Sequence, residues 1–131
     1  YLRRPVQLEP AALVDKLVHG GRGGWCFEQN ALFRLALDAI GFRTTGLAAR
    51  VRWNVLDDVV TPRSHMVLLV EAGGEPWLAD VGFGGLTLTA PLRLVTGVEQ
   101  ETPHERFRLV HDGDALAQQG LVAGEWRTTY R

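Results

Sequence analysis

The chain has 131 residues, of which 46% are hydrophobic and 22% charged, and its 14 basic and 15 acidic side chains give a formal net charge of −1. This length supports one domain, or two small subdomains that share a core, and the apolar fraction excludes a wholly disordered chain. The sequence contains no run of about 18 apolar residues, which excludes a transmembrane helix. The near-zero net charge argues against a nucleic-acid-binding protein, because such proteins present a basic face to phosphate.

Cys26 is the only cysteine of the chain. Neither an intrachain disulfide nor a cysteine-based zinc site can therefore form. A single thiol fits a reducing cytoplasm, and the polar, proline-containing opening at residues 1–5 does not resemble a secretory signal. We therefore expect a cytoplasmic protein that binds no metal, no membrane and no nucleic acid.

Two amphipathic helices are expected in the first part of the chain. Residues 8–18 carry one apolar stripe with Pro10 near its start, and residues 27–40 repeat apolar side chains at helical spacing. Gly41 is placed to end the second helix in the left-handed conformation. Between the two helices, residues 22–26 (RGGWC) predict a tight loop.

From residue 42 onwards the hydrophobic pattern changes to alternation, which is typical of strands. Strands are expected at 47–53, 65–70 and 75–81, with weaker signals at 86–95, 107–111, 116–122 and 126–130. Turn signals separate several of them, with a four-residue turn at 71–74, a glycine loop at 82–85 and a hairpin at 112–113. The sequence thus predicts an α+β fold in which a helical segment, residues 1–41, packs on an antiparallel β-barrel or sheet formed by residues 42–131.

Cys26 lies where the glycine loop enters the second helix. A helix N-terminus favours an anion such as a thiolate, and such surroundings can lower the pKa of a cysteine from about 8.5 to roughly 3.5–7.5. The Glu28 carboxylate in the same turn opposes a second negative charge, so a nearby cation is needed, either Arg22 or a protonated histidine. The alternative interpretation is a buried, unreactive cysteine at a capped helix.

His65 is the candidate base among four histidines, because it opens an apolar strand where an unpaired imidazole would be costly to bury. If residues 71–74 form a four-residue hairpin loop, Val70 pairs with Glu75 and His65 lies directly opposite Asp80 on the same face. Asp80 could then hold one ring nitrogen and leave the other for the thiol. A one-residue change of register would separate the pair. Otherwise His65 is a core histidine bonded to backbone, and Asp80 caps the next turn.

The glycine loop after Asp80 could take part in binding. Successive backbone N–H groups in such a loop can cradle a phosphate, although most glycine loops are only turns. Phe83, between the glycines, fits either the mouth of a pocket or a simple packing role.

Three segments resemble the arylamine N-acetyltransferase family. Residues 22–30 (RGGWCFEQN) resemble its catalytic cysteine motif, residues 61–66 (TPRSHM) its histidine segment and residues 80–84 (DVGFG) its aspartate segment. Their order and spacing also agree, with 39 residues from the cysteine to the histidine and another 15 to the aspartate. The resemblance is firmest over residues 13–88 and faint beyond residue 94.

The resemblance implies a papain-like cysteine-transferase core that works by a ping-pong mechanism. Cys26 would be the nucleophile, His65 the base and Asp80 the residue that orients the base. Acetyl-CoA would leave its acetyl group on Cys26 as a thioester, and an arylamine or hydrazine would then take it. Acetyl-CoA would thus be a co-substrate, and no cofactor would be bound permanently.

Other positions match the family less specifically. Thr61, Phe83 and Gly84 match acetyl-CoA-binding positions, and Phe83 also matches the acceptor pocket. Arg22 and Glu28 match positions that support the catalytic loop. Most of the family's first helices and its C-terminal α/β lid domain have no counterpart in these 131 residues. We therefore expect a piece of a longer enzyme, which could associate with itself or with a complementing chain.

Two alternatives remain open. The residues by themselves support a Cys-His-Asp acyl-transfer site, and either water or an amine can resolve an acyl-enzyme. A papain-like or transglutaminase-like cysteine hydrolase is therefore the first alternative, and an inactive fragment of such an enzyme is the second. An acetyl adduct after incubation with acetyl-CoA would favour the transferase, and an unreactive Cys26 in iodoacetamide at pH 6 would favour the inactive fragment.

Overall fold

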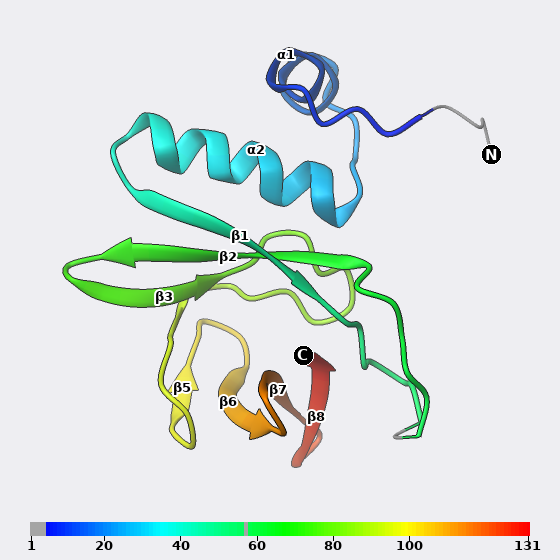
Figure 1. Ribbon diagram of the computed structural model, residues 1–131, viewed down its shortest axis with the longest axis vertical. Coiled ribbons are helices and arrows are strands. Elements are labelled where there is room, and N and C mark those ends of the chain that lie inside the picture. Colours follow the sequence, from blue (N-terminus) through cyan, green and yellow to red (C-terminus); the bar gives the residue numbers. More distant parts are fainter. Residues whose placement is uncertain (1–4, 57) are drawn as a thin grey trace.

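The computed structural model describes residues 5–56 and 58–131. Two helical stretches come first: α1 (Pro10–Leu13) continues into a π-helical stretch, η1 (Val14–His19), and α2 (Cys26–Ala39) follows a short loop. The strands are β1 (Arg43–Ala49), β2 (His65–Ala72), β3 (Glu75–Ala79), β4 (Leu92–Arg93), β5 (Glu99–Glu101), β6 (Arg106–Asp112), β7 (Ala115–Val122) and β8 (Glu125–Tyr130). Helices precede strands, so the predicted α+β organisation is confirmed (Figure 1).

The strands form two four-stranded antiparallel sheets, in the orders β1-β2-β3-β4 and β5-β6-β7-β8. The sheets meet where β1 and β8 end. Val51 forms an isolated bridge with Tyr130, and Arg50 and Arg131 exchange two backbone hydrogen bonds of 2.7 and 3.0 Å. The end of the second sheet is thereby fixed beside the first.

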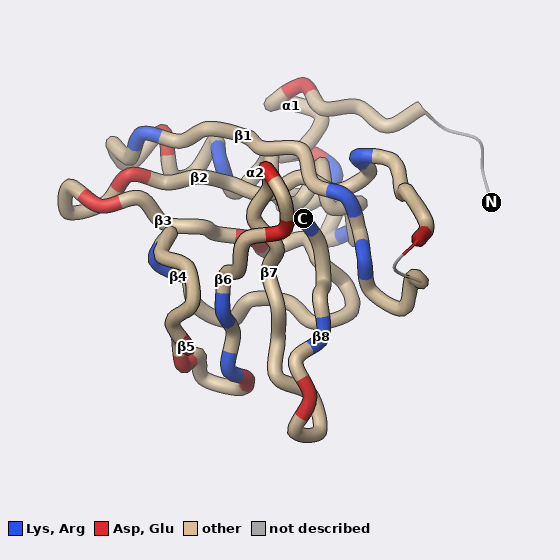
Figure 2. Tube along the Cα trace, turned by 60° about the horizontal axis from the view of Figure 1, so that its bottom comes forward, with Lys and Arg blue, Asp and Glu red and all other residues tan. Residues whose placement is uncertain are grey.

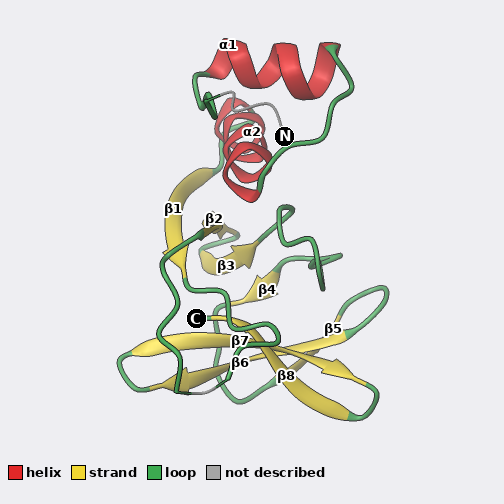
Figure 3. Ribbon diagram, turned by 90° about the vertical axis from the view of Figure 1, so that its right-hand side faces the viewer, coloured by secondary structure: helices red, strands yellow, loops and turns green. Residues whose placement is uncertain are grey.

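The helices, the first sheet and the second sheet are stacked as three layers (Figure 3). Because successive side chains of a strand point to opposite faces, β2 contributes side chains to the cores on both sides of its sheet. Val67 belongs to the core cluster that includes Phe107 of the second sheet. Leu68 belongs to the cluster packed against Phe33 and other side chains of α2. His65 has the same parity as Val67, so its side chain faces the second sheet.

The core between the sheets is almost completely buried. Phe107 and Leu92 have no exposed surface, and Leu109 is only 2% exposed. Each such side chain contributes about 1.5–3 kcal/mol through removal from water. The site described below therefore borders the best-buried part of the molecule.

The β2–β3 hairpin is tighter than the sequence analysis expected. Ala72 pairs with Glu75, so the turn consists of Gly73 and Gly74 alone, with φ values of +61° and +80°. Two-residue hairpins of this kind need positive φ at both central residues, which glycine adopts freely. The predicted four-residue turn at 71–74 is therefore wrong. β2 extends two residues further toward the turn than expected, and β3 begins at Glu75 as expected.

Other boundaries also differ from the sequence expectations. The strand expected at 47–53 is β1, which begins at Arg43 and ends at Ala49. The stretch at 86–95 contains only the two-residue β4, directly after Pro91, whose missing N–H cannot join a ladder. The Glu-Gln-Glu strand β5 was not expected, because it has no apolar alternation. Gly41 does adopt a left-handed conformation after α2, with φ of +97°.

Charged residues of both signs are interspersed over the fold, as Figure 2 shows. Within residues 5–56 and 58–131, no helix is both long and apolar enough to cross a lipid bilayer.

Candidate active site

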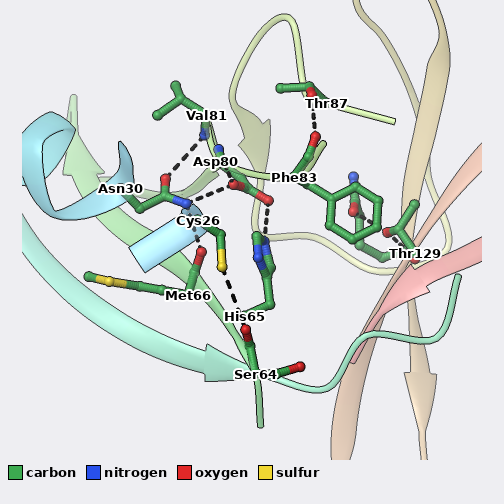
Figure 4. A network of polar contacts seen from close by, with 12 residues as sticks. Cys26, Asn30, Ser64, His65, Met66, Asp80, Val81, Phe83, Thr87 and Thr129 are labelled. Atoms are coloured by element: carbon green, nitrogen blue, oxygen red, sulfur yellow. Dashed lines mark hydrogen bonds and ion pairs between the residues drawn. The ribbon is translucent and has the colours of Figure 1, made fainter. Parts of the chain in front are cut away.

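Cys26 is the first residue of α2 and is partly buried. The loop residue before it, Trp25, has extended backbone angles and caps the helix, and its N–H donates a 2.8 Å hydrogen bond to the Glu28 carboxylate. The Cys26 thiol donates to the carbonyl of Ser64 over 3.5 Å. Ser64 directly precedes His65, so this contact holds the sulfur at the start of β2, as Figure 4 shows.

The cation that offsets Glu28 is Lys16. Its ammonium lies 2.6 Å from the Glu28 carboxylate, which is almost completely buried. Burial raises the pKa of Glu28, but the hydrogen bonds from Lys16 and Trp25 and the charges of Lys16 and Arg22 outweigh it, so the net pKa is lowered. The main cation beside Glu28 is therefore Lys16, and the expectation that Arg22 or a protonated histidine fills this place is wrong. The charge of Arg22 also helps to lower the pKa of Glu28.

His65 and Asp80 form a buried pair, and each residue is 2% exposed. The ring nitrogen Nε2 lies 2.7 Å from the Asp80 oxygen Oδ2. An ionised carboxylate only accepts, so Nε2 carries the proton and Nδ1 is left as a basic nitrogen. Burial raises the pKa of Asp80, but the hydrogen bond and charge of His65 outweigh it, helped by hydrogen bonds from Asn30 and Gly82, so the net pKa is lowered.

The pair forms although the expected register is wrong. Leu68 pairs with Ala79, so Asp80 follows the last residue of the ladder and lies two positions away from the place opposite His65. A shift of two residues keeps a side chain on the same face, whereas a shift of one moves it to the other face. His65 and Asp80 therefore meet diagonally instead of directly.

Asn30 is a site residue that the sequence analysis did not single out. It lies one helical turn after Cys26 and has no exposed surface. Its Nδ2 donates to Asp80 Oδ1 over 2.8 Å and to the Met66 carbonyl over 2.7 Å, and its Oδ1 accepts from the Val81 N–H over 3.1 Å (Figure 4). The four-residue spacing from Cys26, which puts both on one helix face, was the available signal.

Gly82 lets the loop after Asp80 approach α2. A Cβ at this position would lie 2.8 Å from the Cys26 Cα and 2.7 Å from Asn30 Nδ2, so no larger residue fits without a shift. The Gly82 N–H donates to Asp80 Oδ1 over 2.8 Å. This N–H is therefore engaged by the carboxylate and is not available to a phosphate.

Two aromatic side chains also pack against the imidazole. The ring centroids of Phe83 and Tyr130 lie 5.3 and 5.0 Å from that of His65, and 5.5 Å from each other. The buried Tyr130 hydroxyl makes no hydrogen bond of ordinary geometry with the described residues, but it lies close enough to the Asp80 carboxylate to interact with it. Burial raises the pKa of Tyr130 well above its ordinary value, and the charge of Asp80 and a hydrogen-bonding interaction with Asp80 raise it further. Tyr130 comes from β8, so no local pattern pointed to it.

The other residues named from the sequence lie around this centre. Phe83 is 6% exposed and belongs to the core between the sheets, which fits the packing role. The Thr61 hydroxyl donates to the Val51 carbonyl over 2.8 Å, and the Thr61 carbonyl accepts from Arg50. Gly84 is exposed, and a Cβ there would meet open space. Their roles in binding stay predictions.

The arrangement combines a thiol at a helix N-terminus, an imidazole with one free nitrogen and an ionised carboxylate that orients it. These are the parts of a nucleophilic acyl-transfer site. Among residues 5–56 and 58–131, no three histidine, cysteine, aspartate or glutamate side chains gather as a metal site would need.

Comparisons with known proteins agree with this geometry. A family model described as N-acetyltransferase matches residues 1–131. The arylamine N-acetyltransferase / N-hydroxyarylamine O-acetyltransferase of Salmonella typhimurium is 45% identical over 131 residues, which cover 98% of this chain and 46% of that protein. The arylamine N-acetyltransferase of Escherichia coli is 46% identical over 132 residues, 99% of this chain and 46% of that protein.

Solved structures show the same likeness. The arylamine N-acetyltransferase of M. tuberculosis superposes with a TM-score of 0.95 at 45% identity, covering 98% of this chain and 49% of that one. That of Mycobacterium marinum in complex with CoA gives a TM-score of 0.93 at 46% identity, with coverages of 96% and 48%. This chain thus spans about half the length of the relatives it matches. On the family match and these identities, the chain belongs to the arylamine N-acetyltransferase family.

Proposed function

We propose that this chain carries the catalytic triad of an acetyl-CoA-dependent arylamine N-acetyltransferase, with Cys26 as nucleophile, His65 as base and Asp80 as the residue that orients the base. The observation that carries the proposal is the buried pair of His65 and Asp80, joined over 2.7 Å, at the strand end where the Cys26 thiol contacts Ser64. Family membership and a relative's structure with CoA support the choice of donor.

The first half-reaction loads the enzyme. The Nδ1 atom of His65 takes the thiol proton of Cys26, and the thiolate attacks the carbonyl carbon of acetyl-CoA. The bond between that carbon and the CoA sulfur breaks, and CoA leaves with the proton from the imidazolium. The product is an acetyl thioester on Cys26. Asp80 stabilises the imidazolium through Nε2 and fixes the ring while the proton moves.

The second half-reaction transfers the acetyl group from Cys26 to the acceptor. The nitrogen of an arylamine or hydrazine attacks the thioester carbonyl, His65 accepts a proton from that nitrogen, and the Cys26 thiolate leaves and is reprotonated. An amine must outcompete water at this step. Phe83 is proposed to border the acceptor, and Thr61, Phe83 and Gly84 are proposed to border the path of CoA.

Intact-mass spectrometry after incubation with acetyl-CoA tests the proposal. We expect one acetyl adduct on the native chain, its loss on addition of an arylamine or hydrazine, and no adduct on Cys26→Ser. The matched control is Ser64→Ala, which keeps the Ser64 carbonyl and therefore the adduct. Cleavage of peptides or amides without an acetyl adduct would instead favour a cysteine hydrolase.

A further inference from the structure

We propose that Asn30 is a positioning residue of this site, which locks the Asp80 carboxylate in the rotation that serves His65. The inference rests on the proposed triad and extends it by one residue. Asn30 is fully buried in α2 and contacts no solvent. It touches neither the thiol nor the imidazole by any hydrogen bond among the described residues, so its action on both must pass through the groups that it holds.

The amide joins three separate parts of the site. Through Nδ2 it binds the carbonyl of Met66, the residue after His65, over 2.7 Å. Through the same nitrogen it binds the Asp80 carboxylate over 2.8 Å, and through Oδ1 it accepts the N–H of Val81, the residue after Asp80, over 3.1 Å. Since Asn30 sits one turn after Cys26, a single side chain links the helix of the nucleophile to the strand of the base and to the loop that carries the acid (Figure 4).

The carboxylate contacts explain how this link fixes the acid. Asp80 Oδ1 accepts two hydrogen bonds, from Asn30 Nδ2 and the Gly82 N–H, both over 2.8 Å. Oδ2 accepts from His65 over 2.7 Å. A rotation of the carboxylate would break all three at once inside a buried site, where unpaired polar groups are costly. Two donors on Oδ1 therefore hold Oδ2 on the imidazole.

A purely structural role makes a different prediction. If Asn30 only satisfied two backbone groups, its loss would weaken the fold but leave the thiol of the folded protein unchanged. If it positions Asp80, its loss lowers the stability of the imidazolium and therefore of the thiolate. The pH dependence of Cys26 alkylation by iodoacetamide separates the two roles, because it reads the thiolate without any substrate.

The first variant is Asn30→Asp, which keeps the shape of the side chain but replaces the donor NH₂ with an acceptor beside the Asp80 carboxylate. We expect alkylation at pH 6 to slow by about tenfold or more, the scale of a lost hydrogen bond to a charged group, and the profile to move to higher pH. Gln29→Glu is the matched control, because it makes the same amide-to-acid change one residue earlier in α2. A profile for Asn30→Asp that coincides with that of Gln29→Glu would overturn the proposal.

A double-mutant cycle covers the case in which Asn30→Asp does not fold. Asn30→Ala and Asp80→Asn are made singly and together, and alkylation rates are compared in the fraction that circular dichroism shows to be folded. We expect Asn30→Ala to slow alkylation in the native background and to have little further effect beside Asp80→Asn. Additive effects would overturn the proposal. An unreactive native chain at pH 6 would instead contradict the proposed triad itself.

Discussion

The two sides of the His65 imidazole are built in opposite ways. On one side lies a polar network in which every oxygen of Asp80 has a partner, contributed by α2, by the loop at Gly82 and by His65 itself. The aromatic side is formed by the rings of Phe83 and Tyr130, and the Tyr130 hydroxyl makes no hydrogen bond of ordinary geometry with the described residues, although it interacts with Asp80. One side is specified by hydrogen bonds and the other by packing.

The polar side and the aromatic side therefore have different roles in the site. Hydrogen bonds are directional, so the polar side can fix which ring nitrogen carries the proton. Ring contacts of this kind are worth about 0.5–1.5 kcal/mol each and depend less on orientation, so the aromatic side can exclude water and limit tilting. We therefore expect changes on the polar side to alter chemistry and changes on the aromatic side to alter stability.

The largest effect is expected for Asp80→Asn, on the polar side. The amide would favour the wrong tautomer of His65, a change that lowers turnover by about 10⁴-fold in a serine-protease triad. Acetylation and alkylation rates at pH 6 measure it. Glu75→Gln, an exposed acid-to-amide change on the adjoining strand, is the control and should leave both rates unchanged. Near-normal rates in Asp80→Asn would show that the pair does not orient the base.

Lys16→Met tests a second, largely buried ion pair, which joins Lys16 of η1 to Glu28 in the first turn of α2. The change leaves the Glu28 carboxylate buried without its ammonium partner. Breaking a fully buried pair costs about 3–5 kcal/mol, and because 26% of the Lys16 side chain is exposed, we expect a smaller loss of about 2 kcal/mol in the free energy of unfolding. Urea unfolding measures it, with Lys16→Arg as the control that keeps the charge. Equal stability of the two variants would contradict the account.

Acid should weaken the polar side. The pKa of Asp80 is lowered in the folded chain, so its contribution to stability is complete above the unfolded value of about 3.9 and is lost as the pH falls toward the folded value. We expect the free energy of unfolding to fall more steeply below pH 4 in the native chain than in Asp80→Asn. Urea titrations at several acidic pH values test this, and parallel curves would argue against it.

The contribution of Tyr130 to the free energy of unfolding should be lost in alkali. At neutral pH, replacing Tyr130 should have the smallest effect of the changes considered. The pKa of Tyr130 is raised, so the stability due to its neutral form is complete below pH 10 and is lost as the pH rises above that value. Tyr130→Phe should abolish this loss. At pH 7 it should change the unfolding free energy by only about 1 kcal/mol or less, because the hydroxyl makes no hydrogen bond of ordinary geometry, and it should leave the alkylation profile unchanged. A displaced profile would show that the hydroxyl takes part in the polar network.

The sequence was sufficient for the features that depend on local pattern. The apolar run at 65–70 indicated a strand, the hairpin after it indicated that His65 and Asp80 share a face, and the motif around Cys26 indicated the helix start. The register was wrong by two residues, yet the face was right, because period-two alternation does not distinguish even shifts. The partners from distant segments were not predictable in this way. Lys16 and Tyr130 reach the site only when the helices and the second sheet are assembled, and nothing in their immediate neighbourhoods marks them. For Asn30 the only local signal is its four-residue spacing from Cys26, which does not show that its amide binds Asp80.

The close approach at Gly82 also has a consequence for the order in which the protein matures. The contacts that complete the site join α2 to residues 50 and more positions further along the chain. Contacts between residues so distant in sequence form late and slowly compared with a helix or a hairpin. A refolding chain should therefore acquire its helix first, while Cys26 still behaves as an ordinary thiol. The rate at which a pulse of alkylating reagent modifies Cys26 would then report on a late step of folding, because the thiol becomes reactive only when α2 has packed against the segment around Asp80.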